Sequence, residues 1–167
     1  MTVKQPITRP EAADPCEMGS LNEAYRQCAQ RGARLTPIRR LVLRLLQQYP
    51  DGVKAYQLLA ILRRYQQNAT PPTVYRALDF LITQGLAFRL SNNSLFVPST
   101  LGPQPAQSSG VILVCPLCHR VTELHGSAIP NAVSSLLTAT GHQLEDQPLE
   151  IGATCPACIS EGARCHQ

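Results

Sequence analysis

Residues 70–97 read TPPTVYRALDFLITQGLAFRLSNNSLFV, and this stretch decides how the front half of the chain folds. Thr70 followed by two prolines is typical of a helix start, and Gly85 predicts where that helix ends. Between them, apolar residues recur at the spacing of one helix face. They are Val74, Leu78, Leu81 and Ile82, with Phe80 nearby. Residues 86–90 and 95–97 are short apolar segments around an Asn-rich turn, which predicts a β-hairpin.

Further helices are predicted before this one. Ser20 and Glu23 fit a capping box that would open a helix over residues 20–31. Thr36 followed by Pro37 predicts the start of a second helix. Its apolar face comprises Ile38, Leu41, Val42, Leu45 and Leu46, and that of a third helix comprises Ala55, Leu58, Leu59 and Leu62. Several helices followed by a hairpin indicate a winged helix, although a hairpin on a helical core can also be purely structural.

The charge of the chain is concentrated in this front half. Residues 20–90 hold 11 Lys or Arg and 3 Asp or Glu, whereas residues 91–167 hold 2 basic and 5 acidic residues. The formal net charge of the whole chain is only +4, so the uneven distribution of charge is more informative than the total. A basic segment of this kind indicates a polyanionic partner, most simply double-stranded DNA. The alternative is an ordinary solvated helical surface.

Polar side chains at the start of the helix after Thr70 are candidates for reading DNA. Thr73, Tyr75 and Arg76 fall off the apolar stripe within the first two turns, where a recognition helix contacts bases. Arg76 can offer two donors to guanine O6 and N7, and Tyr75 can contact a thymine methyl or a phosphate. The alternative for Arg76 is an ion pair with Asp79 three residues along an ordinary surface helix.

Two C-x-x-C pairs mark the rear half. Cys115 and Cys118 form the first pair, and Cys155 and Cys158 follow after 36 intervening residues. Two such pairs predict a tetrahedral zinc ion bound by four thiolates, which leaves no open position for catalysis and indicates a structural role. The alternative is a thiol–disulfide redox protein, because single C-x-x-C motifs also serve that chemistry.

The residues between the cysteine pairs predict a small folded unit. Strands are expected at residues 111–114 and 121–124, a helix over 129–140, and a returning strand within 144–154 that is kinked or on an edge at Pro148. The helix is expected to turn Val133, Leu136 and Leu137 inward. The fold class is therefore α+β: a winged-helix domain followed by a small α/β domain with a four-cysteine zinc site.

Several functional classes are excluded by the 167 residues as a whole. No apolar run reaches the length that crosses a bilayer, and residues 1–14 contain no signal-peptide core, so we expect a cytoplasmic protein without membrane partners. No Ser-His-Asp set, phosphate loop or H-E-x-x-H motif is evident. We therefore expect neither an enzyme nor a small-molecule substrate.

Three segments together resemble the ferric uptake regulator family: residues 34–39 (RLTPIR), 55–58 (AYQL) and 71–81 (PPTVYRALDFL). With the cysteine pairs, the resemblance covers residues 20–160, and segment 71–81 looks most like the zinc uptake regulator branch. It implies a homodimeric, zinc-responsive transcriptional repressor that binds operator DNA and controls zinc uptake genes. An iron- or peroxide-responsive regulator of the same family is the alternative.

The resemblance also implies roles for individual residues. Tyr75 and Arg76 match recognition-helix positions, and Arg39 and Tyr56 match positions that approach the DNA backbone. The four cysteines named above match the structural zinc ligands. The implied organisation is a flexible leader (1–19), a DNA-binding domain (20–97), a hinge or linker (98–110), a dimerisation domain (111–160) and a tail (161–167).

The chain departs from the family at the regulatory metal, which is expected at the hinge with His, Cys and Glu ligands. Phe88 stands where the zinc branch has a histidine, Pro98 or Ser99 where it has a cysteine, and Gln107 or Ser108 near the linker histidine. Glu123 remains. A later strand has Asp146 in place of a usual histidine.

Two interpretations therefore remain: the regulatory metal binds other ligands, or the chain has lost the regulatory site. The candidate ligands of a relocated site are Glu123, His125, His119 and His142, followed by Asp146, Glu150, Cys16, Cys28, Cys165 and His166. Taken singly, each is more typical of a surface group or of a group beside a metal ligand. Cys28 is expected to be a small buried apolar residue on the first helix.

Overall fold

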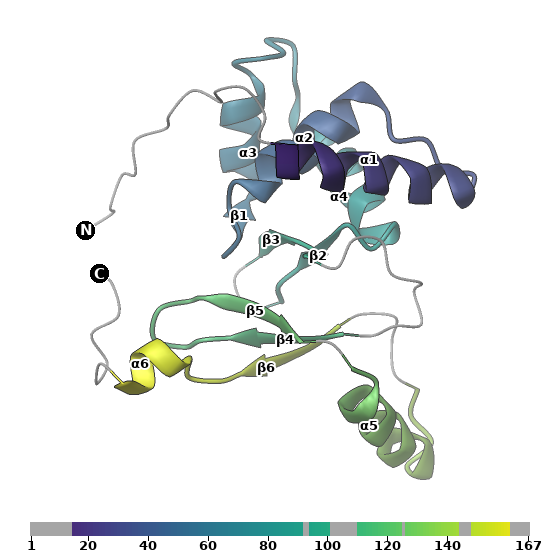
Figure 1. Ribbon diagram of the computed structural model, residues 1–167, viewed down its shortest axis with the longest axis vertical. Coiled ribbons are helices and arrows are strands. Elements are labelled where there is room, and N and C mark those ends of the chain that lie inside the picture. The colour runs from purple at the N-terminus through teal and green to yellow at the C-terminus, as the bar shows by residue number, and fades with distance from the viewer. Residues whose placement is uncertain (1–14, 92–93, 101–109, 125, 144–147, 161–167) are drawn as a thin grey trace.

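The structure is a computed structural model that describes residues 15–91, 94–100, 110–124, 126–143 and 148–160. Four helices and a three-stranded sheet form the front half, and a second three-stranded sheet with two helices forms the rear half (Figure 1). The predicted α+β fold is confirmed. Within the described ranges, no helix is both long and apolar enough to cross a membrane.

The front helices pack around one apolar core. They are α1 (Pro15–Gln30), α2 (Pro37–Gln47), α3 (Ala55–Leu62) and α4 (Pro71–Thr83). Thr36 caps α2 as predicted, because its hydroxyl accepts a hydrogen bond from the backbone N–H of Arg39 at 3.5 Å. Gly85 follows the end of α4 with φ +69°, a left-handed conformation that glycine adopts without strain.

The predicted start of the first helix is wrong. The helix begins at Pro15 rather than Ser20, so residues 15–19 are helical and not part of a loose leader. Glu23 is not a capping residue, because its carboxylate accepts a hydrogen bond from Gln27 one turn later at 2.6 Å. Residues 1–14 of the predicted leader lie outside the described residues.

The predicted hairpin forms the wing. Strands β2 (Ala87–Arg89) and β3 (Leu95–Pro98) pair antiparallel, and the short β1 (Val53–Lys54) adds to the other edge of β3. Sequence patterning missed β1, which has only two residues and a single buried side chain, Val53. β3 includes Pro98, the first residue of the predicted linker, and residues 101–109 lie outside the description.

The rear sheet has the order β5-β4-β6. Strand β4 (Val111–Val114) pairs antiparallel with β5 (Val121–Leu124) and parallel with β6 (Leu149–Gly152). Helices α5 (Ala128–Ala139) and α6 (Pro156–Ser160) complete this half, and α6 was not predicted. β6 begins directly after Pro148, so that proline precedes the strand instead of kinking it.

Helix α5 leaves its apolar side chains largely uncovered. Leu136, predicted to point inward, is 71 % exposed, while Val133 and Leu137 are half-buried. Figure 1 shows α5 projecting away from the helices of the front half. The expectation that this face lies in the core of the protomer is therefore wrong for Leu136, because no described part of the chain covers its side chain.

The two halves meet at a second, smaller apolar cluster. Leu90 and Val97 from the wing pack with Ile112 from β4, and all three are at most 2 % exposed. Half-buried neighbours from both halves surround them: Phe88, Leu95, Val114 and Val121. The wing therefore rests directly on the rear sheet.

Candidate metal centre and nucleic-acid interface

The four cysteines of the two C-x-x-C pairs converge at one end of the rear sheet. Their sulfur atoms all lie within 4.8 Å of one another. The Sγ atoms of Cys115 and Cys158 are 3.8 Å apart, and those of Cys118 and Cys155 are 3.6 Å apart. Four thiolates about 2.3 Å from a tetrahedral zinc ion would be about 3.8 Å apart, so the sulfur spacing fits this metal.

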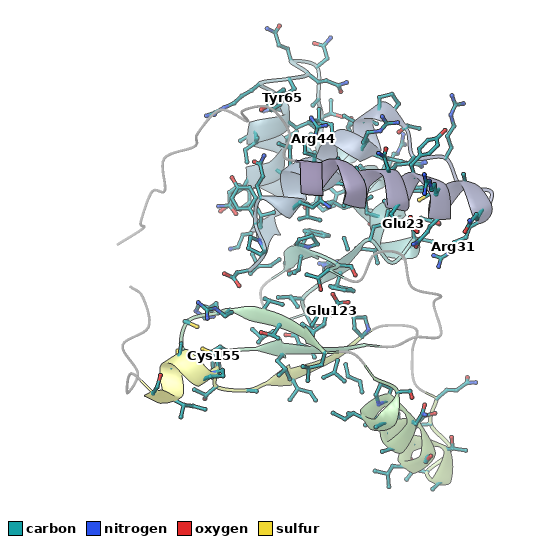
Figure 2. All side chains as sticks on the ribbon, in the orientation of Figure 1. Glu23, Arg31, Arg44, Tyr65, Glu123 and Cys155 are labelled. Atoms are coloured by element: carbon teal, nitrogen blue, oxygen red, sulfur yellow. The ribbon has the colours of Figure 1, made fainter. Side chains whose placement is uncertain are left out.

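The strand register brings the two pairs together. Val114, at the end of β4, lies beside Gly152 at the end of the parallel strand β6. The chain therefore leaves both strands at the same end of the sheet. Cys155 leads into α6, at the lower left of Figure 2. In the first pair, the backbone N–H of His119 donates to the Cys115 carbonyl at 2.9 Å, and His119 adopts φ +60° to close this turn.

Backbone hydrogen bonds prepare two of these sulfurs for metal. Backbone N–H groups, first that of Cys118 and then that of Cys155, lower the pKa of the Cys115 thiol to about 6. The backbone N–H of Cys158 is the largest cause that lowers the pKa of Cys155. Because zinc binds the thiolate form, these bonds favour the ligand state at neutral pH.

Among the described residues, one further cysteine, Cys28, lies outside this cluster. Cys28 is 1 % exposed in the front core, as predicted, and burial raises its pKa. A buried thiol of this kind behaves as a small apolar side chain. The side chain of Cys16 and the residues Cys165 and His166 lie outside what the structure describes.

The predicted DNA-reading residues lie on the outer face of α4. Tyr75 is 50 % exposed, Arg76 is exposed, and Thr73 is half-buried with its hydroxyl 2.9 Å from that of Thr70. Within the described residues, Arg76 and Asp79 do not form the ion pair that was the alternative for Arg76. The Arg76 guanidinium is thus available to an external acceptor.

Tyr56 and Arg39 differ in their surroundings. Tyr56, in the first turn of α3, is 66 % exposed. Arg39 is half-buried, donates a hydrogen bond from Nη1 to the Arg34 carbonyl at 2.7 Å, and stacks on the ring of Phe80. The role of Phe80 was missed, because helical spacing marks a residue as apolar but not as a platform for a side chain from another helix.

The candidate regulatory ligands do not assemble. Among the described residues, the four cysteines are the one group of three or more potential metal ligands. His119 and His142 are exposed, and His142 Nδ1 lies 3.0 Å from the Thr140 hydroxyl. His125, Asp146 and the linker position Gln107 lie outside the description.

Glu123 and Glu150 instead connect the two halves. Glu123 accepts hydrogen bonds from residues 99 and 100, which follow β3, and Glu150 accepts one from the backbone N–H of Ser91. Figure 2 shows Glu123 between the helical half and the rear sheet. No sequence signal marks these contacts, because the partners are small polar residues 24 and 59 positions away.

Comparison with curated proteins gives relatives that span most of the chain. A zinc uptake regulation protein from Escherichia coli (strain K12) is 36 % identical over 146 residues, which cover 87 % of this chain and 85 % of that protein. A ferric uptake regulation protein from Synechocystis sp. (strain ATCC 27184 / PCC 6803 / Kazusa) is 28 % identical and covers 79 % of this chain and 81 % of its own length.

Solved structures of zinc uptake regulators are also similar to this chain. A zinc uptake regulator complexed with zinc and DNA has a TM-score of 0.78 at 35 % identity, covering 87 % of this chain and 97 % of that one. The crystal structure of holo XcZur has a TM-score of 0.76 at 38 % identity, covering 85 % and 98 %. The ferric uptake regulator family model matches residues 30–152. The chain therefore belongs to the ferric uptake regulator family.

Proposed function

We propose that this chain is a zinc-responsive transcriptional repressor that binds operator DNA as a homodimer in the cytoplasm and controls zinc uptake genes. One observation carries the proposal: nearly the whole chain matches a zinc uptake regulator bound to zinc and DNA, with a TM-score of 0.78. In this proposal, residues 20–97 bind DNA, residues 111–160 form the dimerisation domain, and residues 98–110 connect them.

The front half supplies the DNA-binding surface. Helix α4 presents Tyr75 and Arg76 from its first two turns, as a recognition helix in the major groove would. Arg76 would read a base edge with two donors, while Thr73, Arg39 and Tyr56 would contact the groove or phosphates. Residues 20–90 hold 11 basic and 3 acidic residues, and this positive charge would supply a long-range attraction to the DNA phosphates.

The four thiolates would hold a zinc ion with a structural role. Four protein ligands complete a tetrahedral shell, so the ion would staple the two C-x-x-C turns together and offer no site for a substrate. This agrees with membership of a family of transcription regulators rather than enzymes. It also disfavours the thiol–disulfide alternative, because all four sulfurs face one centre.

A second copy of the chain would cover the exposed apolar side chains of the rear half. Leu136 is 71 % exposed, Ile129 44 %, and Leu124 and Ile151 37 % each. Large exposed apolar side chains that gather into a patch are typical of protein–protein interfaces. Burial at a twofold interface would place two recognition helices for the two half-sites of an operator.

The test is DNA binding at controlled free zinc. The purified chain selects a sequence from a pool of random DNA duplexes, and fluorescence anisotropy then measures its affinity for that duplex in zinc buffers. We expect binding to appear with zinc loading and to weaken about 10³- to 10⁵-fold between 50 and 200 mM salt if 6–10 phosphates are contacted.

Iron and manganese buffers serve as controls for the nature of the metal. Tighter DNA binding with Fe²⁺ than with Zn²⁺ would favour the iron-responsive alternative. A chain that carries zinc but selects no duplex at low salt would refute the proposed function.

A further inference from the structure

The boundary between the two halves has no set of side chains that fits a metal ion in the described residues. Phe88 packs in the apolar cluster at this boundary, and Pro98 is buried in β3. Neither side chain can ligate a metal. The regulatory metal that the family resemblance implies at this place therefore does not fit the described residues. Of the ligands that the resemblance implies, Glu123 remains at this boundary.

The carboxylate of Glu123 already accepts hydrogen bonds from the chain. Its Oε2 accepts the backbone N–H of Thr100 at 2.9 Å and the Thr100 hydroxyl at 2.8 Å. The Ser99 hydroxyl lies 3.3 Å from Oε1 and 3.5 Å from Oε2. A carboxylate that accepts an N–H and two hydroxyls has most of its lone pairs occupied, and charge-assisted bonds of this kind are the stronger ones.

Two more carboxylates bridge the same boundary. Glu150 on β6 accepts the backbone N–H of Ser91 in the wing at 2.9 Å. In the opposite direction, Asp51 of the front half accepts the backbone N–H of Val121 on β5 at 3.0 Å. The front half and the residues that follow β3 are therefore tied to the rear sheet at three positions, through Asp51, Ser91 and residues 99–100. These contacts lie beside the shared apolar cluster of Leu90, Val97 and Ile112.

We propose that Glu123 is a positioning residue: with Asp51 and Glu150 it holds the DNA-binding half against the rear half directly, where a metal ion would otherwise be required. Fixing this angle lowers the cost of reaching the DNA-competent shape, because a binding-competent state that is already populated needs no ligand to select it. Over 87 % of this chain, the arrangement is similar to that of a zinc uptake regulator complexed with zinc and DNA. Among the described residues, the four-cysteine site is then the one place where zinc acts on this chain.

The proposal rests on the proposed function for its DNA readout only. Its other readouts are zinc counting and small-angle X-ray scattering of the purified full-length protein. We expect one zinc per protomer in the parent chain and in every Glu123 variant. A metal-ligand role for Glu123 requires instead a second zinc that Glu123→Ala removes.

The variants separate hydrogen bonding from metal ligation. Glu123→Ala is expected to increase the radius of gyration and to weaken operator binding on the order of tenfold, while Glu123→Gln, which can still accept the Thr100 N–H, loses less. Thr100→Val removes one hydroxyl donor to Glu123 and should weaken binding about threefold, although Thr100 is not itself a candidate zinc ligand. Glu23→Gln on the surface of α1 is the matched control and should change nothing.

Three outcomes would overturn the proposal: a second zinc that depends on Glu123, scattering and DNA affinity of Glu123→Ala equal to those of the parent, or no effect of Thr100→Val beside a large effect of Glu123→Gln. If the parent binds no DNA, the proposed function fails. The zinc counts and the scattering would still decide the role of Glu123.

Discussion

The guanidinium carbon of Arg39 lies 3.6 Å from the centroid of the Phe80 ring, so a cation from α2 is stacked on an aromatic side chain from α4. The Arg34 carbonyl fixes the guanidinium from another side at 2.7 Å. Phe80 follows Arg76 by four residues, which places the two on neighbouring positions of one helix face. Positive groups from two helices are thereby brought to the same side of the domain.

Removing the Phe80 ring is expected to weaken DNA binding through Arg39. Phe80→Leu keeps an apolar side chain but removes a cation–π contact of about 0.5–1 kcal/mol, which is about two- to fivefold in affinity. Arg39→Ala should cost more, and the double variant should be no worse than Arg39→Ala alone. Tyr25→Leu is the matched control, because Tyr25 lies on α1 rather than on α4. Its ring centroid is 5.7 Å from the guanidinium carbon of Arg40, not of Arg39. Additive losses in the double variant would show that Phe80 does not act through Arg39.

Arg76→Ala is expected to reduce sequence discrimination rather than overall attraction. If its two donors read a guanine, the loss is about 1–3 kcal/mol against the preferred sequence, with little change for unrelated DNA. Anisotropy titrations with the selected duplex and a scrambled duplex measure the ratio. Arg26→Ala, an exposed arginine on α1, is the control for charge alone. Equal losses on both duplexes would make Arg76 a phosphate contact.

Loss of the zinc ion is expected to unfold the rear half first. This half has few buried side chains of its own, and a four-thiolate zinc can supply on the order of 10 kcal/mol to folding. Cys118→Ser or chelation should therefore lower the melting temperature of the rear half and abolish dimers, as seen by circular dichroism and light scattering. Cys28→Ala should leave the zinc count unchanged, since Cys28 is outside the cluster. If the Cys118→Ser chain melted at the same temperature as the parent, the zinc ion would have no structural role.

A charge on the exposed face of α5 is expected to separate the dimer. Leu136→Glu places a carboxylate where 71 % of an apolar side chain is uncovered in one protomer, and burying it against a second copy would be costly. Analytical ultracentrifugation should then give monomers with the zinc retained. Asn131→Glu, on the polar face of the same helix, should leave the dimer intact. Dimers in both variants would move the interface away from α5.

The elements that could be predicted from sequence are those whose signals are local. Thr36 before Pro37, the spacing of Val74, Leu78 and Leu81, and the two C-x-x-C pairs each depend on a few neighbouring residues, and the structure has the corresponding cap, helix and cluster. The start of α1 was missed because a local capping pattern at Ser20 competed with a longer helix that packs its later turns in the core.

The contacts between the halves could not be predicted for a different reason. Glu123 with Thr100, Glu150 with Ser91 and Asp51 with Val121 are pairs whose geometry depends on how the wing lies on the rear sheet. The 71 % exposure of Leu136 could likewise not be predicted, because helical periodicity marks an apolar face but does not tell whether the same chain covers it.

The parallel pairing of β4 with β6 has a consequence for synthesis on the ribosome. It separates the two cysteine pairs by 36 residues, so the first two sulfurs emerge well before the last two. The helical front can collapse around its own core during this interval, whereas the ion can be captured only once Cys158 has been translated. A chain that terminates early would therefore carry a folded helical half without the four-cysteine cluster of the rear half.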